Sequence, residues 1–329
     1  MKTKNITKCI IPMLSSIFIF TITIIANGNN IEISKQIKDY IESYRISEKR
    51  PEIKITNEQL KEADPNKILE VLLPYENDSE EFVRRVTHRT LVRIANFHPD
   101  NKKVRQEVVM RLTESGFNKT DNEATGLLME FNSRDFNQQS KYLIRKALDE
   151  AKIQKDTSPS FIRLCGIADM KEELPLLKEL LIDEKNYEGG IGINKSKLNW
   201  INWISSTGWN ARLARSRMGV KEDIIKCLEL AESIEDPDER VLRILPAIGY
   251  IRQPEAIEYL KKYLESNKRL PSETPNTKGS LYALRALHIL AACLKNFPVE
   301  QKESRGYTQE ELDLCRKWMS EQKEWQIIR

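Results

Sequence analysis

The sequence has little glycine and very little histidine. Only 12 of the 329 residues are glycine, about half the usual share, whereas sheets and barrels with many tight turns depend on glycine. The three histidines, His88, His98 and His288, are far apart, and none stands in a His-Glu pair. Because metal centres need clustered ligands, the sequence predicts a helical protein that holds no metal and no cofactor.

The sequence also lacks the motifs of common catalytic sites. It has no GxSxG nucleophile elbow, no CxxC pair and no cysteine with an obvious histidine partner. The segment "GGIGINKSK" has the glycine-to-lysine spacing of a phosphate-binding loop, but Asn194 replaces the glycine before Lys195, and the preceding residues have a helical period. The sequence therefore predicts an insertion loop here and no catalytic residue. A pair drawn from its 49 acidic residues stays open as an unrecognised hydrolytic site.

Four cysteines follow the N-terminal segment, and each lies within an apolar helical pattern: Cys165, Cys227, Cys293 and Cys315. A free cysteine behaves as a small buried hydrophobe, so the pattern predicts core positions. In an oxidising compartment the four could also pair, with three possible connectivities, and the sequence leaves this alternative open.

The N-terminus has the layout of a secretory signal. Three lysines precede an apolar run from Cys9 to Ala26 that contains no charged residue. Ala26 and Gly28 are small residues two positions apart, as signal peptidase prefers, so we expect a signal peptide over residues 1–28 with cleavage after Gly28. The protein would then be exported, either periplasmic or secreted. An uncleaved signal that anchors the chain in the membrane is the alternative, because the run is just long enough to span a bilayer.

The charge of the mature chain is close to zero. Removal of residues 1–28 takes away three lysines and no acid, which lowers the 53 basic residues to 50 against 49 acidic residues. Basic and acidic residues also alternate along most of the predicted helices. Nucleic-acid binding needs accumulated positive charge, so we expect no nucleic-acid partner, and contact with a membrane only through an uncleaved signal.

Helix start signals recur along the chain after a charged N-terminal lead-in, residues 29–77. In "DPDERVLRIL" an aspartate precedes a proline that suits the first helical turn. Capping boxes, in which an N-terminal side chain and a glutamate three residues later bond each other's backbone amides, are predicted for Asp78 with Glu81, Asp236 with Glu239, and Thr308 with Glu311. Each such signal predicts a helix.

The predicted helices come in pairs that resemble one another. The segments "GIADMKEELPLLKELL" and "AIGYIRQPEAIEYLKKYL" align with Ile167 opposite Ile248 and, after a gap in the turn, Leu177 opposite Leu260. One hairpin cannot bury its apolar stripe alone, whereas stacked hairpins share a continuous core. The pattern predicts an all-α protein, an α-solenoid of stacked antiparallel helix pairs.

The segment "RVLRILPAIGYIRQPEAIEYLKKYL", Arg240 to Leu264, resembles a HEAT repeat of the short, phycobilisome-lyase-like type. The whole chain also looks like exported bacterial HEAT-repeat proteins of unknown function. The resemblance implies a right-handed superhelix that binds other macromolecules, and it implies no reaction. The predicted organisation is a signal peptide at 1–28, a lead-in at 29–77, a repeat array at 78–296 with an insertion at 186–210, and a C-terminal capping helix and tail at 297–329.

One stretch departs from the repeat and gathers aromatic and basic side chains: "NYEGGIGINKSKLNWINWISSTGWNARLARSR". Tryptophan and arginine are enriched at binding hot spots, and insertions into solenoids often decorate one face. We expect Trp209 and Arg212 to line a partner site. The alternative is that Trp200 and Trp203, three apart on a helix, fill core space in an enlarged repeat.

These expectations combine into one functional hypothesis with two alternatives. The chain is expected to be an exported helical-repeat scaffold that binds a protein or peptide in the cell envelope and is not an enzyme. In the first alternative the repeats bind a glycan or cell-wall polymer, which predicts exposed aromatic side chains along a groove. In the second, the helices support an unrecognised hydrolase near 186–217, which predicts a tight acidic cluster in a pocket.

Overall fold

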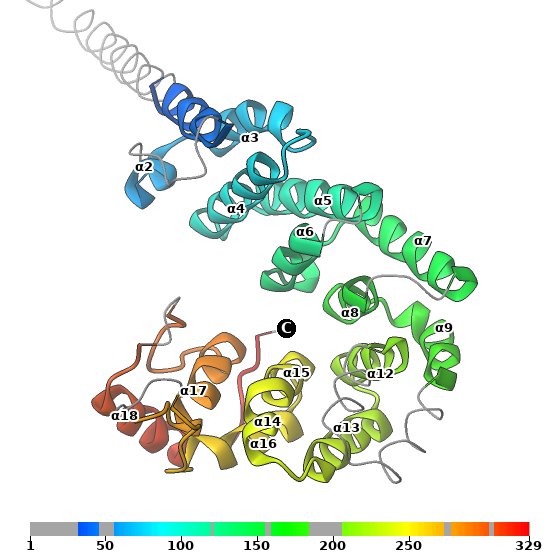
Figure 1. The fold of residues 1–329 in the computed structure, drawn as a ribbon, viewed down its shortest axis with the longest axis vertical. Helices are drawn as coiled ribbons and strands as arrows, with labels where there is room; N and C mark the ends of the chain where they lie inside the picture. Colours follow the sequence, from blue (N-terminus) through cyan, green and yellow to red (C-terminus); the bar gives the residue numbers. More distant parts are fainter. Residues whose placement is uncertain are drawn as a thin grey trace, which may run out of the picture. The chain divides into compact units, whose positions relative to one another are not determined.

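The structure is a computed structural model. It describes residues 32–45, 56–119, 122–154, 159–183, 206–272, 278–302 and 306–328. Throughout these residues the chain is helical, and its β pairings are two isolated bridges (Figure 1). The prediction of an all-α protein is therefore confirmed. The proposed signal peptide and most of the 186–210 insertion lie outside the described residues.

No helix in the described part of the chain is long and apolar enough to cross a membrane.

The chain divides into two compact units, residues 1–127 and residues 128–329. The first unit contains a helix over residues 32–45, followed by α2 (Asn57–Glu62), α3 (Pro65–Leu72), the 3-10 turn η1 (Leu73–Tyr75), α4 (Glu81–Phe97), α5 (Lys102–Lys119) and α6 (Asn122–Leu127). Helix α4 packs against α2, α3, α5 and α6. Its buried side chains, among them Leu91 and Ile94, make it the centre of this unit's core.

The second unit begins with short turns and continues with longer helices. Its first part contains η2 (Leu128–Glu130), η3 (Ser133–Asp135), α7 (Gln138–Gln154), α8 (Pro159–Ile167), η4 (Lys171–Glu173), α9 (Leu174–Glu179), η5 (Leu180–Asp183), α12 (Thr207–Arg217) and α13 (Lys221–Ser233). Its second part contains α14 (Pro237–Glu239), η6 (Arg240–Ile244), α15 (Leu245–Ile251), α16 (Pro254–Leu264), α17 (Tyr282–Cys293) and α18 (Gln309–Glu321). Elements α14, η6 and α15 follow one another without a break, and η6 is a wide π turn in which the Leu245 amide donates to the Arg240 carbonyl.

Helices of the second unit pack as pairs, and the pairs contact one another. Each of α12, α15 and α17 packs against the helix that follows it, which is α13, α16 or α18. We call α12, α15 and α17 the first helices of their pairs, and count with them α8, which precedes them in the same row. In this row α12 contacts α8, α15 contacts α12, and α17 contacts α15. The second helices α13 and α16 contact each other in the same way.

The four first helices of this unit end with the same backbone turn. Each is followed by a residue with positive φ, and the residue three positions earlier is small: Gly166 before Asp169, Ser216 before Gly219, Gly249 before Arg252 and Cys293 before Asn296. A left-handed residue ends a helix by turning the chain back. The small residue lets the next first helix approach closely. A Cβ on Gly249 would lie 2.1 Å from Ile289 Cγ2 of α17, and one on Gly166 would lie 2.9 Å from the Ala214 backbone of α12.

This repeated turn shows that the residue-by-residue alignment of α8 with α15, made from the sequence, is shifted. Asp169 and Arg252 hold the same left-handed position, so Gly166 corresponds to Gly249. The pairing of Ile167 with Ile248 is therefore wrong by two residues. Apolar stripes repeat every three to four residues and match almost as well after such a shift, whereas the helix end and the close approach fix one register.

The predicted helix starts have mixed outcomes. Thr308 and Glu311 form the predicted capping box at α18, and Asp236 accepts hydrogen bonds from two amides at the start of α14. The box predicted for Asp78 and Glu81 is wrong. Helix α4 begins at Glu81 without a side-chain cap, because the Asp78 carboxylate accepts from the Glu80 amide and pairs with Arg45 at the end of the helix over residues 32–45.

Candidate functional site

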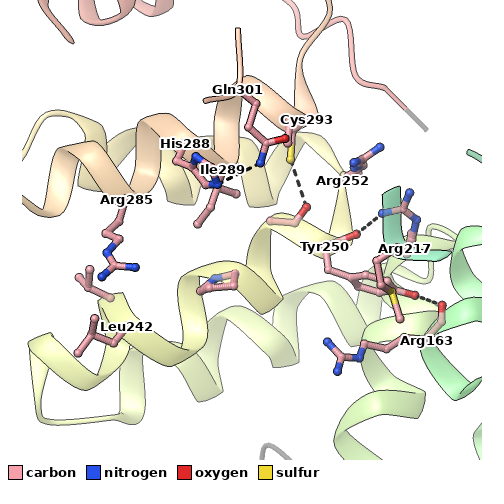
Figure 2. Close-up of a pocket in the computed structure, with 15 residues that line it drawn as sticks. Arg163, Arg217, Leu242, Tyr250, Arg252, Arg285, His288, Ile289, Cys293 and Gln301 are labelled. Carbon is pink, nitrogen blue, oxygen red and sulfur yellow. Dashed lines mark hydrogen bonds between the residues drawn. The ribbon is translucent and has the colours of Figure 1, made fainter. Parts of the chain in front are cut away.

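A pocket of about 330 Å³ opens to solvent on the row of first helices in the second unit. Its walls come from α8, α12, η6, α15 and α17, together with residues that follow α15 and α17 (Figure 2). About half of the lining is apolar, and it includes Leu242, Pro246 and Ile289. The row of packed hairpins therefore creates a concave site from residues far apart in sequence.

The charges of the pocket have one sign. Four arginines line it, namely Arg163, Arg217, Arg252 and Arg285, and among the described residues its lining contains no aspartate or glutamate. Each arginine comes from a different first helix or from the turn that ends one. A concave wall with several guanidinium groups and no carboxylate attracts anions.

Tyr250 stands among three of these arginines. The carbon at the centre of the Arg217 guanidinium lies 5.0 Å from the Tyr250 ring centroid, and Arg217 Nη1 donates to the Tyr250 carbonyl oxygen at 2.7 Å. The Tyr250 hydroxyl donates to the Arg163 carbonyl oxygen. Burial raises the pKa of Tyr250, although the positive charges of Arg217, Arg163 and Arg252 oppose that shift. The phenol therefore stays neutral and contributes no negative charge to the pocket.

Arg163 has no ion pair within the described residues. Burial lowers the pKa of its guanidinium, and no carboxylate counteracts that shift. Its Nε atom is buried and has no hydrogen-bond partner in the described part of the chain. A buried charge without a partner is costly, and proteins tolerate such a cost mainly where a ligand supplies the missing charge.

Arg252 is held by the backbone on both sides. Its φ of 49° places it in the left-handed region at the end of α15, and its Nη1 donates to the Ile328 carbonyl at 2.9 Å. Residues 326–328 are in turn paired with the end of α17, since the Ile328 amide donates to the Cys293 carbonyl at 2.8 Å. The C-terminal segment thereby fixes one wall of the pocket.

Two side chains in the pocket belong to types that often act in catalysis, and neither is arranged for it. The Cys293 thiol is buried, and it donates to the Gly249 carbonyl at 3.3 Å. Burial raises the pKa of Cys293, although Arg252 and Arg217 oppose that shift, so the thiol is a poor nucleophile. His288 contacts the Tyr307 hydroxyl through Nδ1 at 3.3 Å and Gln301 Nε2 through Nε2 at 3.1 Å. Burial also lowers the pKa of His288, so the imidazole is a neutral member of the wall.

The two residues predicted to line a partner site both lie on α12 but outside the pocket. Trp209 is 1% exposed and belongs to the hydrophobic core. Arg212 forms an ion pair with Asp223, with Nη1 and Oδ1 2.7 Å apart, and Arg215 binds the other carboxylate oxygen. The structure thus gives both residues an internal role, while their contact with a partner stays a prediction.

The sequence did not identify the arginines that form the pocket. Arg217 lay within the basic stretch that drew attention to α12, but Arg163, Arg252 and Arg285 come from three other segments. One feature of the sequence could have indicated the site. Arg217 and Arg252 lie at or near the left-handed turns that end α12 and α15, and these turns recur from one hairpin to the next.

The cysteines lie where the sequence predicted. The four described cysteines are buried and form no disulfide with one another, which confirms their assignment to the core. His88 and His98 belong to the first unit and His288 to the second. Within the described residues no group of His, Cys, Asp and Glu is arranged to hold a metal ion.

The chain matches no family model, no curated protein and no solved structure.

Proposed function

We propose that this chain is an exported helical-repeat scaffold that binds a protein or peptide in the cell envelope and carries no catalytic site of its own. The observation that supports this proposal is the pocket of the second unit, which has four arginines and no carboxylate in its lining. Such a pocket suits recognition of an anionic group. Its thiol and imidazole have roles in the wall, which leaves binding as its simplest use.

The packing of the second unit supports a solenoid of the HEAT type as the scaffold. Successive hairpins of this unit contact each other through their first helices, and α13 and α16 also do so through their second helices. Hairpins stacked in this way are the building blocks of α-solenoids. Proteins of this architecture use the surface along one row of helices to bind partners. The pocket lies on such a row.

The alternative of a glycan or wall polymer receives less support from this site. Sugar binding would require exposed aromatic faces. Tyr250 is the aromatic residue in the pocket lining, and its hydroxyl is already bonded to the protein. The hydrolase alternative is weakened by composition, because residues 186–217 contain a single acid, Glu188. Two carboxylates at one centre would need a second one from elsewhere.

The test is affinity capture from native envelope with a tagged chain of residues 29–329, mild crosslinking and mass spectrometry. Three forms would be compared: wild type, an Arg163→Gln, Arg285→Gln double variant, and an Arg243→Gln control. Arg243 lies on η6 beside the pocket but outside its lining, and its side chain is 58% exposed. We expect wild type and the control to retain the same protein, with crosslinks near α15 and α17, and the double variant to lose it. Retention of wall or glycan fragments without any protein would contradict the proposal.

A further inference from the structure

The arginines of the pocket form two separate positive groups. Figure 2 shows Arg285 at one end, near Leu242, while Arg163, Arg217 and Arg252 lie at the other end around Tyr250. Between the two ends Figure 2 shows the apolar side chain of Ile289 of α17, and Pro246 of α15 also lines the pocket. The site therefore offers two positions for negative charge and an apolar surface between them.

Two of these guanidinium groups, those of Arg163 and Arg285, have no carboxylate partner in the described part of the chain. The pocket lining lacks acidic residues, and within the described residues neither Arg163 nor Arg285 has an ion-pair partner. Arginines elsewhere in the unit differ, since Arg215 binds both Asp223 and Glu222. A planar guanidinium matches a carboxylate through two parallel hydrogen bonds, so carboxylates are suitable ligands for both ends.

The size of the pocket limits what can enter it. About 330 Å³ lies at the lower end of ligand pockets, which span about 300–1,000 Å³. A helix with its side chains is about 10 Å across and would not fit. A short extended segment would fit, and its alternate side chains point in opposite directions, so that only some of them need to enter.

We infer that the pocket binds a short extended acidic segment of the partner protein. One carboxylate lies among Arg163, Arg217 and Arg252, a second lies against Arg285, and an apolar side chain between them rests on Pro246 and Ile289. This inference rests on the proposed peptide-binding function and names the chemistry of its ligand.

The experiment is selection of a random peptide display library on the purified chain of residues 29–329. We expect the selected peptides to be enriched in pairs of Asp or Glu four positions apart with an apolar residue midway between them, because these three side chains share one face of an extended segment. A synthetic selected peptide should bind with an affinity that falls as salt increases. Its affinity should fall roughly tenfold in Arg163→Gln or Arg285→Gln, since each loses a charge-assisted bond. In Arg243→Gln the affinity should be unchanged.

The outcomes separate this inference from the function on which it rests. Selected peptides without acidic enrichment, or peptides that bind both arginine variants as tightly as they bind wild type, would overturn the acidic-segment inference and leave peptide binding intact. A selection that yields no binding peptide would count against both. Unchanged circular dichroism and thermal unfolding in the variants would show that any lost binding reflects the pocket and not the fold.

Discussion

Buried arginines in the second unit fall into two kinds, distinguished by what compensates their charge. Arg215 is 5% exposed and binds Asp223, which is 1% exposed, with Nε and Oδ2 2.7 Å apart. Arg163 is partly buried without any carboxylate. A buried pair that is complete holds a structure together, whereas an uncompensated buried charge lowers stability. Arg215 therefore has a structural role, whereas Arg163 belongs to a candidate ligand site.

Replacement of Arg163 with methionine is expected to stabilise the protein. The substitution keeps much of the aliphatic side chain and removes an uncompensated charge, so we expect the free energy of unfolding to rise by about 1 kcal/mol. Urea unfolding followed by circular dichroism measures the change, and Arg243→Met, on an exposed side chain, should stay within about 0.5 kcal/mol of wild type. A clear loss of stability in Arg163→Met would show that the guanidinium has a structural role instead.

Replacement of Asp223 with alanine is expected to have the opposite effect. The Asp223 carboxylate binds Arg212 and Arg215, and its loss would leave two guanidinium groups without their buried partner. We expect the free energy of unfolding to fall by about 3 kcal/mol, measured by urea unfolding. Glu222→Gln is the matched control, because the Glu222 side chain is 73% exposed and contributes little to its pair with Arg215. Equal effects of the two substitutions would contradict the assignment.

His288 should make stability depend on pH. Burial lowers the pKa of His288 in the folded protein, while the unfolded side chain takes up a proton near its ordinary pKa of about 6.5. The unfolded state then binds more protons, so stability should fall as the pH drops from about 7.5 to about 5.5. We expect this fall, measured by urea unfolding, to be smaller in His288→Gln, which keeps a hydrogen-bonding side chain toward Tyr307 and Gln301. An identical pH dependence in both proteins would exclude His288 as its source.

At the scale of helices, the glycine three positions before a left-handed turn allows α15 to pack closely against α17. A Cβ at Gly249 would lie 2.1 Å from Ile289 Cγ2, so in Gly249→Ala either the Ile289 side chain or the two helices must shift. We expect a loss of about 1–3 kcal/mol in the free energy of unfolding. In an Ile289→Ala background the same substitution should cost less, which a double-mutant cycle measures. Gly126→Ala is the control: its Cβ would meet nothing within 4 Å, and it should be neutral or stabilising.

Helix pairs were predictable from the sequence, but their register and the site were not. Apolar periodicity, caps such as Thr308 and the Asp-Pro starts are local signals, and they indicate helices wherever they occur. The register of the first helices depends on a close contact between Gly249 and Ile289 across two helices. The pocket depends on arginines from four segments. Contacts of this kind follow from packing in three dimensions, and no spacing within one helix encodes them.

At the scale of the whole molecule, each unit has its own buried core, and the pocket belongs entirely to the second. One core cluster of this unit runs from Trp209 on α12 to Met319 on α18, and every residue that lines the pocket lies within residues 128–329. A region with its own core and few dependencies can fold alone. We therefore expect the fragment of residues 128–329 to keep its helical circular dichroism and to unfold in one cooperative transition.

The same fragment should retain binding. A peptide selected on the chain of residues 29–329 should bind the fragment with an affinity within about twofold, because all four arginines and the C-terminal segment that holds Arg252 are present. Isothermal titration calorimetry on both proteins measures this, with Arg163→Gln in the fragment as the matched control. A folded fragment that no longer binds would mean that residues 29–127 contribute to recognition. A fragment that fails to fold would show that the second core depends on the first unit.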